Sequence, residues 1–138
     1  MATSKIAPAP LMAVLAASDI DRVVGFYRDT LGFRVELSDD MPGSARVYTG
    51  GNGVFLVYQT EFKRAETTVA YFMVDDAEGT RDDLRARGVK IEEYDLPNMK
   101  TKDGLVENAG MKSGWFKDSE GNTIGFGEVP AEVLRQAT

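Results

Sequence analysis

Apolar and polar positions follow the same order twice along the chain. Two short apolar runs, Leu11 to Ala17 and Thr68 to Val74, are rich in branched or aromatic residues, as strands are. A shift of 56 residues superimposes the segments that follow, 19–36 and 75–92, by chemical type. Such an internal repeat predicts two copies of one supersecondary unit.

A helix is predicted in each copy between an aspartate and a glycine. Asp19 and Asp75 suit N-cap positions, because a short carboxylate accepts hydrogen bonds from the first turn of a helix. Gly32 and Gly88 suit the position just past the helix, where a positive φ favours glycine. We therefore expect two helices that begin and end alike.

The first of these helices carries a clear apolar stripe, and the second a thinner one. The stripe of the first consists of Ile20, Val23, Val24, Tyr27 and Leu31. The stripe of the second consists of Ala77, Thr80 and Leu84. Both stripes are expected to face a sheet.

After the first helix the pattern alternates as in three strands. Phe33 to Leu37, Ala45 to Tyr48 and Val54 to Tyr58 are the predicted strands, and Gly50 to Gly53 is a turn between the last two. This completes a βαβββ module over residues 9–60.

The second module, residues 67–129, repeats the plan with a longer connection. Its predicted strands are Val89 to Tyr94, a short one at Trp115-Phe116, and Thr123 to Glu128. The polar stretch Leu96 to Ser113 predicts a long loop, either a functional flap over the cleft or a partly ordered insert. Residues 130–138 are predicted as a short helix or tail, so that the 138 residues form a single domain.

Three motifs carry a resemblance to a known superfamily. They are the strand that ends in Ser18-Asp19, the run Phe26-Tyr27-Arg28-Asp29-Thr30-Leu31-Gly32-Phe33, and Asp118-Ser119-Glu120-Gly121-Asn122 before the last strand. Together they resemble the glyoxalase/bleomycin resistance/extradiol dioxygenase (vicinal oxygen chelate) superfamily over about residues 9 to 129. Ser119 departs from that pattern, which commonly has proline there.

The resemblance implies an α+β fold in which two βαβββ modules form curled mixed sheets around a ligand cleft, often completed by a second subunit. Strand alternation then assigns residues to the cleft. Large Ile124 and Phe126 would face a helix, and small Gly125 would face the cleft. The predicted ligand-binding residues are Met12, Val14, Arg46, Leu56, Tyr58, Val69, Tyr71, Met73, Trp115 and Gly125. The competing interpretation is solvent exposure for Arg46 and core packing for Trp115.

Metal enzymes of the superfamily hold a divalent ion with one side chain from each of four strands. The resemblance carries these four places onto Met12, Leu56, Val69 and Gly125, none of which offers a suitable donor. The chain also has no histidine and no cysteine. We therefore predict no metal and no other cofactor, with an all-carboxylate magnesium or calcium site as the alternative.

The composition of the chain disfavours some classes of binding partner. Sixteen basic and twenty-two acidic residues give a net charge of −6, which disfavours nucleic acid and anionic membranes. Residues 1–10 lack the apolar core of a signal peptide and predict a short leader strand or frayed arm. No stretch is long and apolar enough to cross a membrane, and we expect a soluble, cytoplasmic protein.

The leading functional hypothesis is a metal-independent small-molecule binding protein, a homodimer that resembles the drug-sequestering branch of the superfamily. Its ligand would be a hydrophobic or aromatic compound, including antibiotics. The first alternative is a glyoxalase-like lyase, isomerase or dioxygenase with an unrecognised metal, or with acid/base groups such as Tyr58 and Tyr71. The second is a non-catalytic interaction module.

Overall fold

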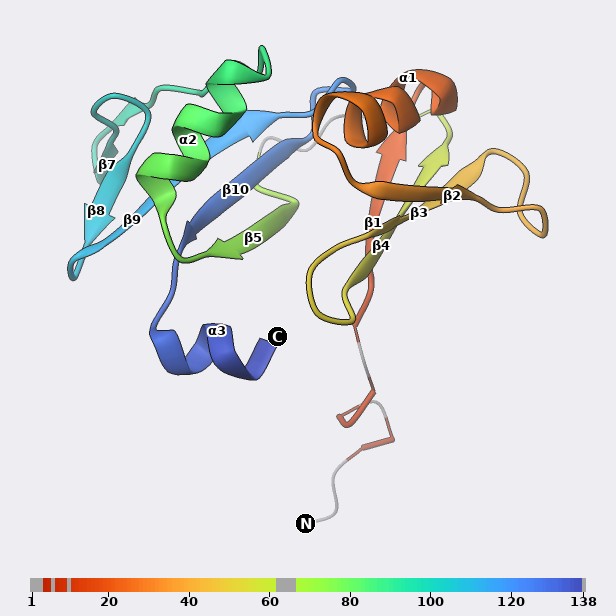
Figure 1. Ribbon diagram of the computed structural model, residues 1–138, viewed down its shortest axis with the longest axis horizontal. Coiled ribbons are helices and arrows are strands. Elements are labelled where there is room, and N and C mark those ends of the chain that lie inside the picture. The colour runs from red at the N-terminus through yellow and green to blue at the C-terminus, as the bar shows by residue number, and fades with distance from the viewer. Residues whose placement is uncertain (1–3, 6, 10, 62–66, 138) are drawn as a thin grey trace.

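The computed structural model describes residues 4–5, 7–9, 11–61 and 67–137, so part of the predicted N-terminal arm and Thr138 lie outside the described residues. Two four-stranded mixed sheets dominate the fold, in the orders β1-β4-β3-β2 and β5-β10-β9-β8 (Figure 1). The strands are β1 (Ala13–Ala17), β2 (Arg34–Leu37), β3 (Ser44–Tyr48), β4 (Val54–Gln59), β5 (Ala70–Val74), β8 (Val106–Asn108), β9 (Met111–Lys117) and β10 (Thr123–Glu128). β1 runs parallel to β4 and β5 runs parallel to β10, while the other neighbours are antiparallel. The predicted α+β fold of two related modules is confirmed.

Two helical segments lie on one side of the two sheets in Figure 1. They are α1 (Ile20–Gly25), which continues into the π-helical η1 (Phe26–Thr30), and α2 (Ala77–Ala86). The C-terminal helix α3 (Ala131–Ala137) lies apart from both, below β5 in this view. No described helix is both long and apolar enough to span a membrane.

The ends of the helices agree with the sequence at three of four predicted positions. Asp19 caps α1 by accepting a hydrogen bond from the backbone N–H of Arg22. Gly32 and Gly88 have φ angles of 80° and 83°, as a residue past a helix requires. The prediction for Asp75 is wrong, because α2 is capped by the next residue, Asp76, which accepts from the N–H of Gly79.

The apolar stripe of the first helix is interrupted by a change of helix type. The N–H of Leu31 donates to the carbonyl of Phe26, five residues back, which is the π-helical pattern. The N–H of Phe33 then donates to the carbonyl of Tyr27 and ends the segment. Val23, Val24 and Tyr27 are buried as predicted, whereas Leu31 is only half-buried.

The core lies between the helices and the sheets and is continuous across both modules. Leu15 and Val57 belong to it in the first module, and Leu84, Ile124 and Phe126 in the second. Ile124 and Phe126 therefore face the helix side, as alternation predicts. Aromatic rings join the two halves, since Phe33 and Phe72 stack with centroids 5.6 Å apart.

The second module departs from the prediction between α2 and β9. The expected strand Val89 to Tyr94 forms only one bridge, between Ile91 and Phe116. Glu93 then accepts hydrogen bonds from Thr101 and from the N–H of Gly104, which turns the chain away from the sheet. The loop expected over Leu96 to Ser113 contains a small hairpin, β6 (Asp95–Leu96) with β7 (Met99–Lys100), then β8 and the start of β9.

The turn between β9 and β10 is hydrogen-bonded to the first module. Asp118 is buried and accepts a hydrogen bond from the Tyr27 hydroxyl, 2.9 Å away. Asn122 donates from its Nδ2 to the carbonyl of Ala16, at the end of β1. These bonds join residues more than 90 positions apart in the sequence.

Glu120, in the same turn, is a buried carboxylate that holds the start of α1. It accepts from the N–H groups of Ser18 and Asp19 and pairs with Arg22, whose Nε lies 2.6 Å from Oε2. The guanidinium of Arg22 is the main cause that lowers the pKa of Glu120 from 4.5 to about 2. The turn that the resemblance identified by its sequence thus joins the modules.

Candidate functional site

The sheet face opposite the helices exposes a set of large apolar side chains. They alternate with core residues such as Leu15 and Val57, so the exposure follows from the two-residue period of a strand. The exposed fractions of these side chains range from 36% to 53%, and the residues are Met12, Val14, Tyr58, Val69, Tyr71 and Met73. All six are predicted cleft residues. We call this surface the open face.

On the first sheet, the pairing register brings three predicted residues into one row across the strands. Val14 of β1 pairs with Leu56 of β4, and Leu56 pairs with Arg46 of β3. The next partner in the row is Glu36 of β2. Arg46 therefore stands on the same face as Val14 and Leu56, at the polar end of an otherwise apolar row.

Arg46 belongs to a charged cluster that the sequence interpretation missed. Its Nη2 lies 3.6 Å from Oε2 of Glu36, and its Nε donates to the hydroxyl of Tyr48. Arg34 pairs with the same carboxylate and covers the Tyr48 ring, with 4.3 Å between the guanidinium carbon and the ring centroid. The hydrogen bond from Arg34 is the main cause that lowers the pKa of Glu36.

Alternation along β2 and β3 was the available signal for this cluster. Arg34 and Glu36 are two residues apart on one strand, and so are Arg46 and Tyr48 on the next, so both pairs share a face. Only the register places the two pairs opposite each other, with Arg34 against Tyr48 and Glu36 against Arg46. Two arginines and one glutamate leave this end of the row with an excess positive charge.

On the second sheet, Tyr71 covers the glycines that were expected to line empty space. Gly125 pairs with Tyr71 on one side and with Trp115 on the other, and it is buried. A Cβ on Gly125 would lie 2.6 Å from Cδ2 of Tyr71, and one on Gly127 would collide with the Tyr71 hydroxyl. The glycines therefore make room for the ring of Tyr71, which covers Gly125 on this face.

Tyr71 and Trp115 differ in their surroundings. Burial raises the pKa of Tyr71, with the carboxylate of Glu128 adding to the effect. Trp115 is half-buried and meets the ring of Tyr94 edge-on, with the centroids 5.6 Å apart. Trp115 is thus partly packed against Tyr94, and its pairing with Gly125 places it in the same row as Tyr71.

A hollow of about 160 Å³ adjoins the open face between the two modules. Tyr71 and Met73 contribute from β5, Thr49 and Gly50 from the turn after β3, and Leu134 from α3. The C-terminal helix therefore borders the surface that carries the predicted ligand residues.

The four positions that the sequence resemblance matches to metal ligands of related enzymes carry no metal donors. Thioether, hydrocarbon and hydrogen occupy Met12, Leu56, Val69 and Gly125. Zinc, nickel or iron requires imidazole, carboxylate or thiolate groups, and these residues do not fit such an ion. Over the described ranges, no three carboxylates lie close enough together to hold a metal ion.

A protein family model matches residues 10–126, and its description is the Glyoxalase/Bleomycin resistance protein/Dioxygenase superfamily. The chain belongs to this superfamily. No curated protein matches the sequence. The sequence resemblance is thereby confirmed at the level of the superfamily.

Solved structures share the fold at low sequence identity. Lactoylglutathione lyase from Agrobacterium tumefaciens is 23% identical, with a TM-score of 0.61 over 88% of this chain and 95% of that one. A glyoxalase/bleomycin resistance protein from Catenulispora acidiphila is 20% identical, with a TM-score of 0.62 over 87% and 97%. The fosfomycin resistance protein FosX from Mesorhizobium loti is 13% identical, with a TM-score of 0.60 over 93% and 98%.

Proposed function

We propose that this superfamily member is a metal-independent binding protein for hydrophobic or aromatic small molecules, including antibiotics. The observation that carries the proposal is the contrast between the four metal positions and their surroundings. Met12, Leu56, Val69 and Gly125 supply no donors, while Val14, Tyr58, Tyr71 and Met73 surround them with exposed apolar surface. Sheet faces that expose this much apolar surface commonly serve as binding sites.

The arrangement of groups on the open face also favours a class of ligand. Tyrosine rings and methionine side chains offer large, adaptable contact area to flat molecules. Glu36 and Arg46 stand at one end of the row and supply the few polar contacts that fix orientation in small-molecule sites. The ligand we propose is flat and mostly apolar, with a polar group that reaches this end.

Two readouts test the proposal on the intact protein, namely the thermal unfolding temperature and the emission of Trp115, the single tryptophan. Bleomycin, proflavine and a neutral polycyclic antibiotic serve as probes. A ligand at 100 times its Kd stabilises the folded state by about 2.7 kcal/mol, which a melting curve resolves easily. At least one probe is expected to raise the unfolding temperature and change the emission, and no response to any of them contradicts the proposal.

A pair of matched substitutions localises the binding. Val14→Asp places a charge at the apolar end of the first row and is expected to weaken binding at least tenfold. Val133→Asp makes the same change at a similarly exposed valine of α3, and it should leave the affinity unchanged. Equal loss in both variants would place the ligand elsewhere.

Metal analysis separates this proposal from an enzymatic function. Protein purified without chelators is expected to contain less than 0.1 equivalent of zinc, nickel, iron or manganese. A stoichiometric metal, or turnover of methylglyoxal–thiol adducts or catechols, would replace the binding protein with a lyase or dioxygenase.

We further propose that two copies associate through the open face, as the superfamily resemblance implies. A second copy would remove exposed Val14, Tyr58 and Met73 from water, which is favourable by about 25 cal/mol per Å² of apolar surface. Light scattering is expected to give twice the mass of one chain, and a monomer at micromolar concentration would contradict this. The mass of Val14→Asp, measured alongside, shows whether its loss of affinity comes from a lost partner.

A further inference from the structure

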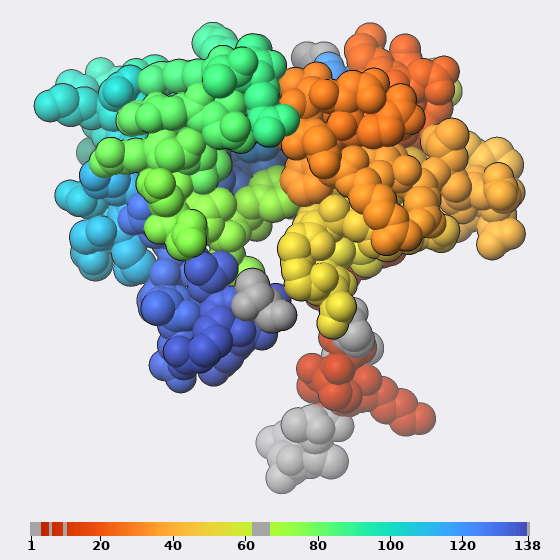
Figure 2. Space-filling model, in the orientation of Figure 1, coloured from red at the N-terminus to blue at the C-terminus, as the bar shows by residue number. Residues whose placement is uncertain are grey.

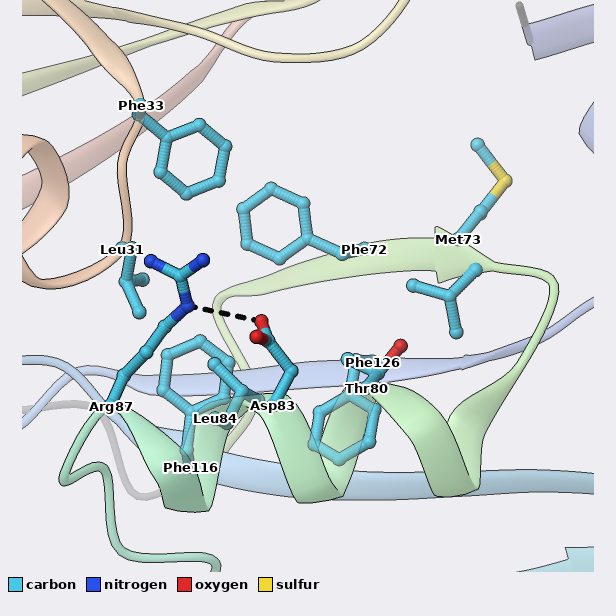
Figure 3. Close-up of a pocket in the computed structure, with 11 residues that line it drawn as sticks. Leu31, Phe33, Phe72, Met73, Thr80, Asp83, Leu84, Arg87, Phe116 and Phe126 are labelled. Atoms are coloured by element: carbon cyan, nitrogen blue, oxygen red, sulfur yellow. Dashed lines mark hydrogen bonds and ion pairs between the residues drawn. The ribbon is translucent and has the colours of Figure 1, made fainter.

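A second cavity, of about 240 Å³, lies on the helix side of the sheets where the two modules meet (Figure 3). Leu31 and Phe33 reach it from the first module, and Phe72, Leu84, Phe116 and Phe126 from the second. Figure 2 shows the α2 segment in direct contact with the segment around η1 along this junction, where Arg87 donates to the carbonyl of Thr30. We call this cavity the junction pocket.

The junction pocket and the open face are on opposite sides of the second sheet. Phe116 and Phe126 line the pocket, whereas their neighbours Trp115 and Gly125 belong to the row beside Tyr71. Because side chains alternate along a strand, most residues of one site are not residues of the other. Met73, in the edge strand β5, is shared, since it lines the junction pocket and also belongs to the open face. Phe33, Phe116 and Arg87, which carry the inference below, are not part of the open face.

The wall of the junction pocket suits a flat ring. Phe33 and Phe72 are nearly parallel, with an interplanar angle of 25°, and Phe116 and Phe126 pair at 6.3 Å between centroids. Aromatic faces and edges attract another ring in offset or edge-on geometry. Phe72 is half-buried, so part of its surface is available to an occupant.

The volume limits the occupant to one or two fused rings. A cavity of about 150 Å³ with similar lining holds benzene, and drug-sized ligands occupy about 300 to 1,000 Å³. At about 240 Å³ the junction pocket lies between these two cases. A bicyclic molecule fits this range, whereas a large antibiotic does not.

The rim of the junction pocket supplies hydrogen-bond donors, and its charged groups balance each other. Nε of Arg87 donates to Asp83, 3.1 Å away, and its Nη1 donates to the carbonyl of Thr30. A guanidinium has five N–H groups, so three have no acceptor within the part of the chain that the structure describes. In Figure 3 the terminal nitrogens of Arg87 point toward Phe33, between Leu31 and Phe72. Asp83 balances the charge of Arg87 and the chain carries −6 overall, so a neutral acceptor is favoured over an anion.

We propose that the junction pocket is a second ligand site, which takes a neutral, flat aromatic molecule of one or two fused rings that carries a carbonyl group. The rings lie among Phe33, Phe72 and Phe116. The carbonyl oxygen accepts from the guanidinium of Arg87. The site joins residues of both modules, so an occupant contacts both.

Coumarin, which has two fused rings and a lactone carbonyl, is the probe. Calorimetric titration of the intact protein is expected to give saturable binding with one site per chain, and NMR is expected to shift the methyl signals of Leu31 and Leu84. Indole, a bicycle without a carbonyl, should bind more weakly, and benzoate more weakly still. No saturable binding of coumarin up to millimolar concentration would overturn the proposal.

Two variants test the wall and the rim separately. Thr80→Phe, at a half-buried position that lines the junction pocket, fills it and is expected to weaken coumarin at least tenfold. Arg87→Gln, at an exposed position, should weaken coumarin about 2- to 10-fold, the range of one net hydrogen bond, and leave indole unchanged. Circular dichroism verifies that both remain folded, and wild-type affinity for coumarin in both would overturn the proposal.

The open face provides the control for location. Val14→Asp is expected to bind coumarin as the wild type does, and coumarin should leave the emission of Trp115 nearly unchanged. Loss of coumarin binding in Val14→Asp, with the Leu84 methyl signals unmoved, would assign the molecule to the open face instead. If coumarin does not bind, the result of the test with the antibiotics is unaffected, so each proposal can be refuted without the other.

Discussion

The two modules place a hairpin turn at the same point, between their last two strands, and the two turns differ in their side-chain contacts. Both are closed by backbone bonds, from the N–H of Thr49 to Gly53 and of Gly53 to Gly50 in the first, and from the N–H of Asp118 to Asn122 and of Gly121 to Asp118 in the second. The turn between β9 and β10 buries Asp118, Glu120 and Asn122 against the first module. One turn only reverses the chain, and the other also joins the modules.

The difference shows that the two modules share a fold, while their corresponding turns have different structural roles. Four donors converge on the carboxylate of Asp118, namely the Tyr27 hydroxyl, the N–H groups of Glu120 and Asn122, and Nδ2 of Asn122. Buried polar groups with complete partners fix one arrangement and make any other costly. In the glycine-rich turn between β3 and β4, the polar side chain of Asn52 is exposed and takes no such role.

Removing the carboxylate of Asp118 should produce the largest effect. Asp118→Ala leaves several buried donors without an acceptor, each of which costs about 1 to 3 kcal/mol. We expect the free energy of unfolding, measured by urea denaturation, to fall by about 3 to 5 kcal/mol. A loss below 1 kcal/mol would show that the turn does not join the modules.

Acid should weaken the same junction through Glu120. Its pKa is about 2 in the folded protein and 4.5 ordinarily, so its contribution is complete above pH 4.5 and is lost as the pH falls toward 2. This amounts to about 2 kcal/mol between pH 5 and pH 3. Denaturation at the two pH values measures it, and in Glu120→Gln this part of the pH dependence should disappear. An unchanged dependence in the variant would assign the acid sensitivity to other carboxylates.

Asn122→Ala tests the bond to the first module with less damage to the turn. The substitution removes the donor to the carbonyl of Ala16 and one of the four donors to Asp118. We expect a loss of about 1 to 2 kcal/mol in the same denaturation experiment. An unchanged free energy of unfolding would mean that Asp118 and Glu120 alone join the two modules.

Asn52→Ala makes the matching substitution in the other turn, where Asn52 is exposed. We expect a change within about 0.5 kcal/mol, as is usual for surface positions away from buried polar networks. A loss as large as that of Asn122→Ala would remove the distinction between the two turns.

Much of the fold followed from local patterns. Gly32 and Gly88 marked the ends of the helices because a positive φ is a local requirement. Asp75 and Asp76 are adjacent and chemically equal, so the choice of N-cap depended on backbone angles that the sequence does not contain. The expected strand after Gly88 was lost because Glu93 finds partners in Thr101 and Gly104, which lie further along the chain.

The candidate site was predicted less completely, because it depends on the register between strands. Alternation identified Val14, Leu56 and Tyr71 as residues of the predicted cleft, and the structure exposes Val14 and Tyr71. That Tyr71 lies over Gly125, and that Glu36 stands opposite Arg46, depends on which residues pair across strands. The junction pocket was not predicted, since α2 and η1 meet only in the folded chain.

The hydrogen bonds that Glu120 accepts from Ser18 and Asp19 also bear on how the protein is made. A ribosome completes the segment of α1 about 100 residues before it reaches Glu120. At about 5 to 20 residues per second, that interval lasts about 5 to 20 seconds. The earliest-made half thus waits for its final hydrogen-bond acceptor until translation has nearly ended, and we expect nascent chains that stop before residue 118 to be more sensitive to protease than the finished protein.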